Sequence, residues 1–288
     1  MFNALKKVSA LALAAVLTLG TGLLAGCNQQ EDVLEEIKKK GSLTMATSPD
    51  FPPFEFYVLD KDGKKQIVGS DIALGQAIAD KIGVELDIKV SDFKGVLANV
   101  QGGQADIAIS GFAKTEERMQ AMQFSEGYQR SSSNGFQGIL TTKEKAATDA
   151  FKDLDSIKEA KLNIGAQAAS IQHEMAGKLT DQAKIKQLGT MEALALALNA
   201  GDLDAVVVST DSAEPMLETS PDFVILPQDG FDLDPENMYS TNVIGFPLGE
   251  EYQSLIDLAN EVIKEARKSG DLEKWNNEAK ALIGQAVE

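Results

Sequence analysis

Arg118 follows a segment of the chain that could hold it in a binding site. A short apolar run at residues 107–109 predicts a buried strand, and Thr115 is a good N-cap for a helix. Arg118 then falls in the first turn of that helix, near the carboxyl end of the strand, where open α/β sheets bind ligands. Its guanidinium suits a planar carboxylate, because the fork makes two parallel charge-assisted hydrogen bonds. The alternative is a surface arginine in an ion pair along its helix.

Few other side chains offer site chemistry. The sequence has one histidine and one cysteine, so no disulfide forms within the chain. A histidine-based metal site or a Ser-His-Asp triad has almost nothing to use. His173 lies among apolar residues of a helix-like segment, and we interpret it as a partly exposed helix residue. We therefore expect no metal site, no catalytic residues and no cofactor.

The composition is that of an acidic globular protein. The 288 residues include 44 acidic and 27 basic side chains, for a net charge of −17, and 43% of them are hydrophobic. This length suggests one or two domains with sizeable cores. The excess of acid argues against nucleic-acid binding and against electrostatic docking on anionic lipid.

The N-terminus has the pattern of a secretory signal. Lys6 and Lys7 precede an uncharged Ala/Leu-rich segment, so residues 1–26 predict a signal peptide. A transmembrane helix is disfavoured because the apolar run is short and is broken by Thr and Gly. The segment ends in Leu-Ala-Gly-Cys27, which resembles the bacterial lipobox, whose cysteine is diacylated and begins the mature protein. The alternative is a chance cysteine after an ordinary signal.

Two sets of alternating strands and helices follow, which is the pattern of an α/β protein. In the first set we expect strands at 43–46, 84–90 and 106–109, with helices at 71–82 and 93–101 between them. The second set has expected strands at 136–140, 162–165, 185–188, 205–208 and 224–226, and helices at 171–179 and 191–199. Two helices at 250–268 and 271–283 close the chain.

Several short motifs occur in a fixed order along these elements. With them the chain resembles the polar amino-acid-binding proteins of bacterial ABC importers, which have the type II periplasmic-binding-protein fold. The similarity extends over about residues 43–275. The motifs that carry it are Pro53-Phe54-Glu55, Gly69-Ser70-Asp71-Ile72-Ala73, Gly103-Gln104-Ala105-Asp106, Thr115-Glu116-Glu117-Arg118, Phe124-Ser125-Glu126-Gly127-Tyr128, Asp204-Ala205-Val206 and Gly270…Lys274-Trp275.

The resemblance implies two α/β lobes joined by two hinge strands. We expect a lipidated tether at 27–40, a first lobe at 41–128 plus 241–288, and a second lobe at 129–240. The crossings are expected near Gln129–Gly135 and Tyr239–Asn242. In this family the lobes close on a ligand held between them, and we expect a monomer.

The resemblance also implies roles at the two charged ends of an amino acid. Arg118 matches the arginine that binds the ligand α-carboxylate. Ser170 stands at the hydroxyl position that meets the same carboxylate at a helix start, although it could be only an N-cap. Ser110 and Gly111 match positions that meet the α-ammonium through carbonyls and hydroxyls, and Ala113 would offer its backbone N–H.

Two aromatic positions match those that sandwich the ligand side chain. Phe51 lies between prolines in a loop, where a purely structural role is less expected. Phe93 is the first apolar position of a predicted helix and could instead be ordinary core. Together with Phe112 they would form an apolar wall, which admits aromatic, aliphatic or long polar side chains.

The sequence departs from the family at the acids that meet cations. The family usually has an aspartate five residues after the Asp204 position, paired with the ligand ammonium, and here Ser209 occupies it. Asp211 lies two residues further on and could supply the charge. A buried ammonium without a carboxylate is costly, so Asp211, another acid, or a ligand without an α-amino group must resolve this. Ser48 replaces an acid that some members use for a cationic side chain, which disfavours lysine, arginine and histidine.

The predicted function is capture of an amino acid or related small ligand outside the cytoplasm. A binding protein anchored to the cell membrane through lipidated Cys27 would deliver it to an ABC permease and its ATPase. One alternative is a ligand-sensing lipoprotein without transport. Another is an enzyme on the same fold, like the related dehydratases. An enzyme needs a placed acid or base, for which Asp50, Glu55 and Glu126 are the candidates, but no arrangement of residues requires catalysis.

Overall fold

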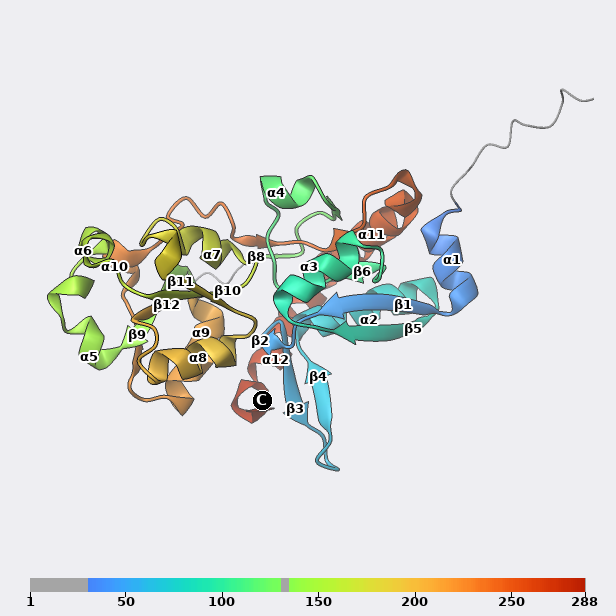
Figure 1. The fold of residues 1–288 in the computed structure, drawn as a ribbon. Coiled ribbons are helices and arrows are strands. Elements are labelled where there is room, and N and C mark those ends of the chain that lie inside the picture. Colours follow the sequence, from blue (N-terminus) through green and yellow to red (C-terminus); the bar gives the residue numbers. More distant parts are fainter. Residues whose placement is uncertain (1–30, 131–134, 288) are drawn as a thin grey trace, which may run out of the picture. The chain divides into compact units, whose positions relative to one another are not determined.

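The computed structural model describes residues 31–130 and 135–287, which form a mixed α/β fold (Figure 1). The signal segment and Cys27 lie outside these residues. The first sheet has five strands in the order β5-β1-β6-β15-β7, of which β5, β1 and β6 are parallel and β15 runs antiparallel to its neighbours. Its strands are β1 Ser42–Thr47, β5 Glu85–Val90, β6 Ile107–Ala108, β7 Gln123–Phe124 and β15 Gly245–Phe246.

The second sheet repeats this arrangement with a later part of the chain. Its order is β11-β10-β12-β9-β13, with β11, β10 and β12 parallel and β9 antiparallel to both β12 and β13. Its strands are β9 Gln137–Thr142, β10 Ile164–Gln167, β11 Ile185–Leu188, β12 Ala205–Ser209 and β13 Phe223–Ile225.

A two-stranded ladder accompanies the passage of the chain between the two sheets. Strand β8 (Gln129–Arg130) pairs antiparallel with β14 (Thr241–Asn242). The first leads toward β9 of the second sheet, and the second leads back to β15 of the first. A further small sheet joins β2 Asp50–Phe51, β3 Glu55–Leu59, β4 Lys65–Val68 and β16 Ala286–Val287.

The helices lie between and after these strands. The α-helices are α1 Val33–Lys40, α2 Ser70–Ile82, α3 Phe93–Gln101, α4 Glu116–Met119, α5 Lys143–Ala146, α6 Leu154–Ala160, α7 Ile171–Ala176, α8 Met191–Asn199, α9 Thr210–Thr219, the kinked α10 Gln228–Phe231, α11 Gln253–Ser269 and α12 Asp271–Lys280. Four short 3-10 helices are η1 Asp149–Phe151, η2 Gln182–Lys184, η3 Glu250–Tyr252 and η4 Ile283–Gln285. No helix within 31–130 and 135–287 is both long and apolar enough to cross a membrane.

Each sheet is covered by helices on both faces, because its central strands are apolar on both sides. In β1, Leu43 and Met45 pack with α2 and α11, whereas Ala46 on the opposite face packs with α3. In β12, Val207 packs with α7 and Val206 packs with α8. Parallel strands covered on both faces leave their carboxyl ends as the open edge where polar side chains gather.

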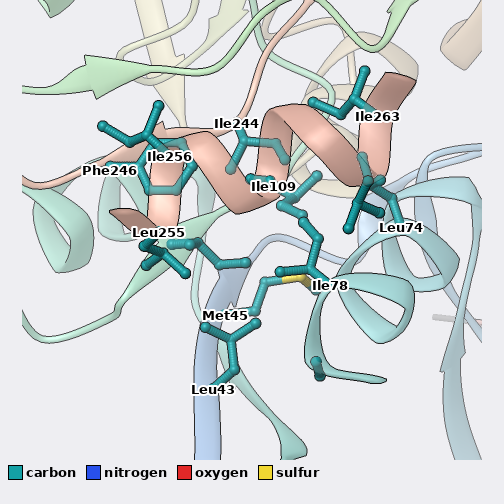
Figure 2. Packing of buried hydrophobic residues seen from close by; sticks show 14 of the residues in the cluster. Leu43, Met45, Leu74, Ile78, Ile109, Ile244, Phe246, Leu255, Ile256 and Ile263 are labelled. Atoms are coloured by element: carbon teal, nitrogen blue, oxygen red, sulfur yellow. The ribbon is translucent and has the colours of Figure 1, made fainter. Parts of the chain in front are cut away.

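The core between the first sheet and its helices is built from apolar side chains, most of them aliphatic. Figure 2 shows them converging from β1, α2 and α11. The residues are Leu43, Met45, Leu74, Ile78, Ile109, Ile244, Phe246, Leu255, Ile256 and Ile263, all of them buried. The apolar spacing of α2 and α11 follows the helical period, so each helix turns one face to this cluster.

Among the segments that differ from the sequence expectations, α1 and α9 matter most here, while α5 and α6 are two further helices that were not expected. The end of the expected tether at 27–40 is helix α1, because Asp32 accepts backbone hydrogen bonds at its start and Val33 and Ile37 are buried one turn apart in the core. Helix α9 follows β12 where no helix was expected. Its sequence contains Pro215, and its large apolar residues are the adjacent Met216 and Leu217, so it shows no clear helical period.

Candidate functional site

A pocket lies where the carboxyl ends of strands from both sheets meet. Residues that follow β1 and β6 line it from the first sheet, and residues at the ends of β10 and β12 line it from the second. Its lining includes eight of the nine ligand-binding residues that the sequence predicted: Phe51, Phe93, Ser110, Gly111, Ala113, Arg118, Ser170 and Ser209. Asp211 is not among the lining residues. The structure thus gathers side chains that are up to 158 positions apart, from 51 to 209.

Arg118 is held rigidly at one end of this pocket. Thr115 caps helix α4 by accepting the backbone N–H of Arg118 at 3.2 Å, as its sequence predicted. The guanidinium donates to Ala113 O at 2.7 Å and to Ala169 O at 3.1 Å, and its carbon lies 5.4 Å from the ring centroid of Phe93. The side chain is only 7% exposed. Carbonyl and ring contacts orient the fork without neutralising its charge.

The charge of Arg118 has no carboxylate partner in the part of the chain that the structure describes. None of the ion pairs in residues 31–130 and 135–287 includes this arginine. Burial lowers the pKa of Arg118 to about 10. The negative charges of Glu174 and Glu117 oppose this shift. The guanidinium therefore stays charged at neutral pH, and an anionic ligand group could pair with it through charge-assisted hydrogen bonds.

A buried carboxyl pair adjoins the pocket lining. Glu55 and Asp71 are both fully buried, and Glu55 lines the pocket. The hydroxyl of Ser110 donates to Glu55 Oε1 at 2.7 Å. Asp71 Oδ2 accepts the N–H of Gly111 at 2.7 Å and the hydroxyl of Tyr128 at 2.7 Å. The turn at 110–111 is therefore fixed from behind by two acids.

These two carboxyls resist ionising together. Burial, followed by the nearby Asp71 carboxylate, raises the pKa of Glu55 well above its usual range. Burial also raises the pKa of Asp71 to about 6, although the hydrogen bonds from Tyr128 and Gly111 oppose this. Two acids in contact without a cation titrate as a pair, with one proton retained well past the ordinary carboxyl range.

Asp50 lines the same pocket and joins the two sheets through hydrogen bonds. Its Oδ2 accepts from Gln167 Nε2 at 2.9 Å and from the N–H of Met191, the first residue of α8, at 3.0 Å. Its Oδ1 accepts the hydroxyl of Ser48 at 2.8 Å. Burial raises the pKa of Asp50 to about 6, against the lowering effect of the Ser48 and Met191 hydrogen bonds. At neutral pH this group is an anion.

Aromatic rings form the apolar part of the lining. Phe51 stacks on Phe54 with ring centroids 5.5 Å apart, and Phe93 meets Phe112 edge to face at 6.2 Å. Phe93 also belongs to a buried cluster with residues of α3 and β6. Its position is therefore both core and pocket wall, so the two interpretations drawn from the sequence are compatible.

Ser170 caps a short helix at the pocket edge. Its oxygen accepts the N–H of His173 at 3.2 Å, while its hydroxyl donates to Gln167 O at 2.7 Å. It precedes α7 and is buried in the lining. The preceding residue, Ala169, has a φ of 63°. This left-handed conformation is uncommon for alanine and turns its carbonyl toward Arg118.

Ser209 and Asp211, the two residues considered as partners of a ligand ammonium, lie in different places. Ser209 is the last residue of β12, is buried and lines the pocket opposite Gln137 in the sheet register. Asp211 lies in the first turn of α9 with its carboxylate against Gly135, and it lines a separate hollow with Pro53. In this structure the acids of the pocket lining are Asp50 and Glu55.

Several polar lining residues were not anticipated from the sequence. The amides of Gln137, Gln167 and Gln172 face the pocket, and Gln172 donates to Gln137 Oε1 at 2.8 Å. Asn242 of β14 also lines it, and its buried Nδ2 has no hydrogen-bond partner within the described residues. Gln137, Gln167 and Asn242 stand in strands and Gln172 stands in α7, and none of them belongs to a distinctive motif. Only the expected hinge crossing at 239–242 indicated that Asn242 would lie near the ligand.

No group of three or more His, Cys, Asp or Glu side chains in residues 31–130 and 135–287 is arranged to hold a metal ion. The charged groups of the pocket are one arginine and the acids described above.

Known proteins with similar sequences bind amino acids. The chain is 28% identical to the arginine-binding extracellular protein ArtP of Bacillus subtilis, over 94% of this chain and 96% of that protein. It is 25% identical to the L-cystine-binding protein TcyJ of Escherichia coli, over 95% of this chain and 94% of that protein. Both alignments span nearly the full length of each protein.

A solved structure supports the fold. An amino acid ABC transporter substrate-binding protein, AbpA from Streptococcus pneumoniae bound to L-arginine, superposes with a TM-score of 0.75 at 33% identity, covering 88% of this chain and 99% of that one. The expected two-lobed type II periplasmic-binding-protein fold, with two α/β lobes joined by hinge strands, is therefore confirmed. The model of the bacterial extracellular solute-binding proteins, family 3, matches residues 43–279, and the chain belongs to that family.

Proposed function

We propose that this protein captures an amino acid between its two lobes, outside the cytoplasm, and delivers it to the permease and ATPase of an ABC importer. The lobes would comprise residues 41–128 plus 241–288 and residues 129–240. Reversible closure needs only a ligand with a higher affinity for the closed state and no catalysis. The similar amino-acid-binding proteins support this function.

The observation that carries the proposal is the buried, positively charged Arg118 in the pocket. Its guanidinium is oriented by Ala113 O and Ala169 O, so that it can meet a carboxylate at the edge of both sheets. The unpartnered Nδ2 of Asn242 offers a further donor in the same lining. A free charge at this depth is costly unless a ligand anion completes it.

The acids of the pocket favour an amino acid with a cationic side chain. Besides Arg118, the lining contains Asp50 and Glu55, the latter backed by Asp71. One guanidinium and two acidic groups match the carboxylate and two cations of arginine. Ser48 stands where some members have an acid for such a side chain, but Asp50 lies two residues away and accepts the Ser48 hydroxyl. Arginine, which the similar ArtP is named for binding, is the first candidate.

Thermal unfolding of residues 28–288 with arginine and its analogues tests this function. A ligand that binds only the folded state raises the unfolding midpoint by mass action. We expect arginine to raise it and agmatine, which lacks the carboxylate, to have no effect at the same concentration. Equal stabilisation by agmatine would contradict the role of Arg118. Stabilisation by neutral amino acids but not arginine would contradict the cationic side chain and leave amino-acid capture in place.

We also propose that Cys27 anchors the protein to the outer face of the cell membrane through acyl chains. The sequence pattern Leu-Ala-Gly-Cys27 supports this attachment. Two acyl chains suffice for stable anchoring of a soluble body. The anchor would keep the binding protein close to its permease.

A further inference from the structure

An amino acid whose carboxylate meets Arg118 also brings an α-ammonium into the pocket. Ser209 and Ala113 lack a charge to meet it, so a buried acid has to be found elsewhere in the lining. Two acids qualify by position, Asp50 and Glu55. Their hydrogen bonds distinguish them.

Asp50 is already fully engaged by protein donors. Its two oxygens accept three hydrogen bonds, from Ser48, from Gln167 and from the N–H of Met191. Two of these donors belong to the second sheet and its helix α8. Asp50 therefore serves first to connect the two sides of the pocket, and a ligand cation would be an additional partner.

Glu55 and Asp71 have a different arrangement. Each uses one oxygen to accept from the turn at 110–111 or from Tyr128. The second oxygen of each, Glu55 Oε2 and Asp71 Oδ1, has no N–H or O–H donor within residues 31–130 and 135–287. The two carboxyls are hydrogen-bond neighbours. A proton shared between these two oxygens satisfies both and leaves the pair with a single negative charge.

Among the described residues, the groups that shift the pKa values of the pair include no cation. Glu55 faces Ser110, Asp71 and the more distant Asp50, and Asp71 faces Gly111 and Tyr128. No lysine or arginine is among the groups that shift the pKa of either acid. A ligand ammonium would therefore be the first positive charge beside this pair, and it would favour the ionised form of Glu55.

We propose that the Glu55–Asp71 pair is the partner of the ligand's α-ammonium in this protein, and that binding releases the proton that the pair shares. This rests on the proposed capture of an amino acid. The ligand ammonium supplies the positive charge that the shared proton supplied before binding, and the proton passes to solvent. Ser209 thus needs no acidic substitute, and Asp211 has no part in binding.

The proposal makes the affinity for amino acids depend on pH. Below the pKa of the shared proton, releasing that proton costs free energy, so affinity rises by up to about tenfold per pH unit as the pH increases. Above that pKa the pair is already ionised, and affinity becomes constant. A hydroxy-acid analogue without the ammonium should show neither proton release nor this pH dependence.

Isothermal titration calorimetry counts the released protons. Arginine and argininic acid, whose hydroxyl replaces the α-ammonium, are titrated into residues 28–288 at about pH 7 in buffers of different ionisation enthalpy. We expect release of up to about one proton per arginine, and none with argininic acid. No release with arginine from about pH 5 to pH 8, or equal release with both ligands, would overturn the proposal. If the proposed-function panel identifies a different amino acid, that ligand and its hydroxy analogue replace this pair.

The variant Glu55→Gln provides an independent test, because the amide keeps an oxygen for the Ser110 hydroxyl and an N–H for Asp71. It should abolish proton release and lower the affinity for arginine by about tenfold to a hundredfold, with less than about threefold change for argininic acid. Asp87→Asn, which removes an exposed acid of β5, is the charge-matched control and should match the wild type.

The outcomes separate this inference from the proposed function. If arginine binds in an Arg118-dependent way but Glu55→Gln keeps both affinity and proton release, only the Glu55–Asp71 assignment fails. If Asp50→Asn instead shows the selective loss for arginine over argininic acid, Asp50 is the ammonium partner and the proposal is wrong. If no amino acid binds at all, the proposed function fails and this inference fails with it. Wild-type proton counting gives a result even if Glu55→Gln does not fold.

Discussion

The pocket depends on single residues that hold its groups in place from behind. Gly111 is one of them: it has a φ of 56°, and a Cβ there would lie 2.7 Å from Phe51 Cδ1. Its N–H is also bound by Asp71. A glycine at this turn therefore lets an aromatic wall and a buried acid approach the same backbone.

We predict that Gly111→Ala weakens ligand binding and lowers the free energy of unfolding by about 1–3 kcal/mol, because it adds backbone strain and displaces the Phe51 ring. Gly103→Ala is the matched control, since Gly103 has a similar φ of 64° and open space around it. Titration calorimetry and urea unfolding measure the two effects. Binding by Gly111→Ala that equals binding by Gly103→Ala would show that the close approach to Phe51 is unimportant.

Asp50 gives a pH-dependent prediction at the same scale. Its pKa is raised to about 6 in the folded protein, so its contribution to stability is present below the unfolded pKa and is lost as the pH rises through about 6. Between about pH 4 and pH 8, wild type should therefore lose up to about 3 kcal/mol of unfolding free energy relative to Asp50→Asn. Urea unfolding of both proteins at several pH values measures this difference. A difference that is constant with pH would contradict the assigned shift.

Sequence motifs identified the pocket residues that stand on a unit of strand, turn and helix. Arg118 was predictable because Thr115 caps its helix directly after a buried strand. Gln137 and Gln167 were not, because an amide in a strand looks the same whether its partner is solvent, another side chain or a ligand. The position of Asp211 against Gly135 was also unpredictable, since it depends on the unexpected helix α9.

Among the elements, helix α1 is the one whose role differs most from its sequence pattern. Its charged residues dominate the segment 33–40, which made it look like a tether. Its apolar face consists of Val33 and Ile37, which are buried against the cluster that includes α11, and of the partly buried Leu34, which packs against the same cluster. Three apolar residues in one short helix are too few for a clear helical period, so tertiary packing decides this element.

Ile37→Ala should lower the free energy of unfolding by about 2–5 kcal/mol, because Ile37 is 1% exposed and its loss leaves a cavity in the core. Chemical denaturation of residues 28–288 measures the change. Glu36→Ala, on the exposed side of the same helix, is the control and should change stability by less than about 0.5 kcal/mol. If the two variants are equally stable, α1 is a tether that only touches the core.

The larger elements followed directly from sequence periodicity. Strand β5 alternates strictly, and α2 and α11 have long apolar faces, so their positions were close to the expected ones. Boundaries moved where caps were weak, as in the 3-10 turn Glu250–Tyr252 before α11. The pairing of β15 and β16 with early strands could not be read from local pattern, because it joins residues far apart in the chain.

At the scale of the whole molecule, two similar sheets place four strand ends around one pocket. The family resemblance, rather than composition, implied two α/β lobes, and the strand order within each sheet was not predicted. The two lobes of the fold are now established, whereas their precise boundaries and the anchor remain predictions.

Replacement of the proposed anchoring residue tests the location of the protein. Cys27→Ser should move the protein from the membrane fraction to the soluble fraction of the producing cells, because acylation needs the thiol. Asn28→Ser keeps the cysteine and should stay with the membranes. Fractionation followed by immunodetection measures the distribution. A Cys27→Ser protein that remains with the membranes would contradict lipid anchoring at this position.

Calorimetric titration of arginine into wild type and Arg118→Ala tests the central claim most directly. The account predicts that wild type binds and that Arg118→Ala loses at least about a hundredfold in affinity, because a buried charge-assisted carboxylate contact is removed. Arg118→Lys, which keeps the charge but not the fork, should fall between them. Circular dichroism should show the same fold in all three proteins. Unchanged affinity in a folded Arg118→Ala protein would contradict the account.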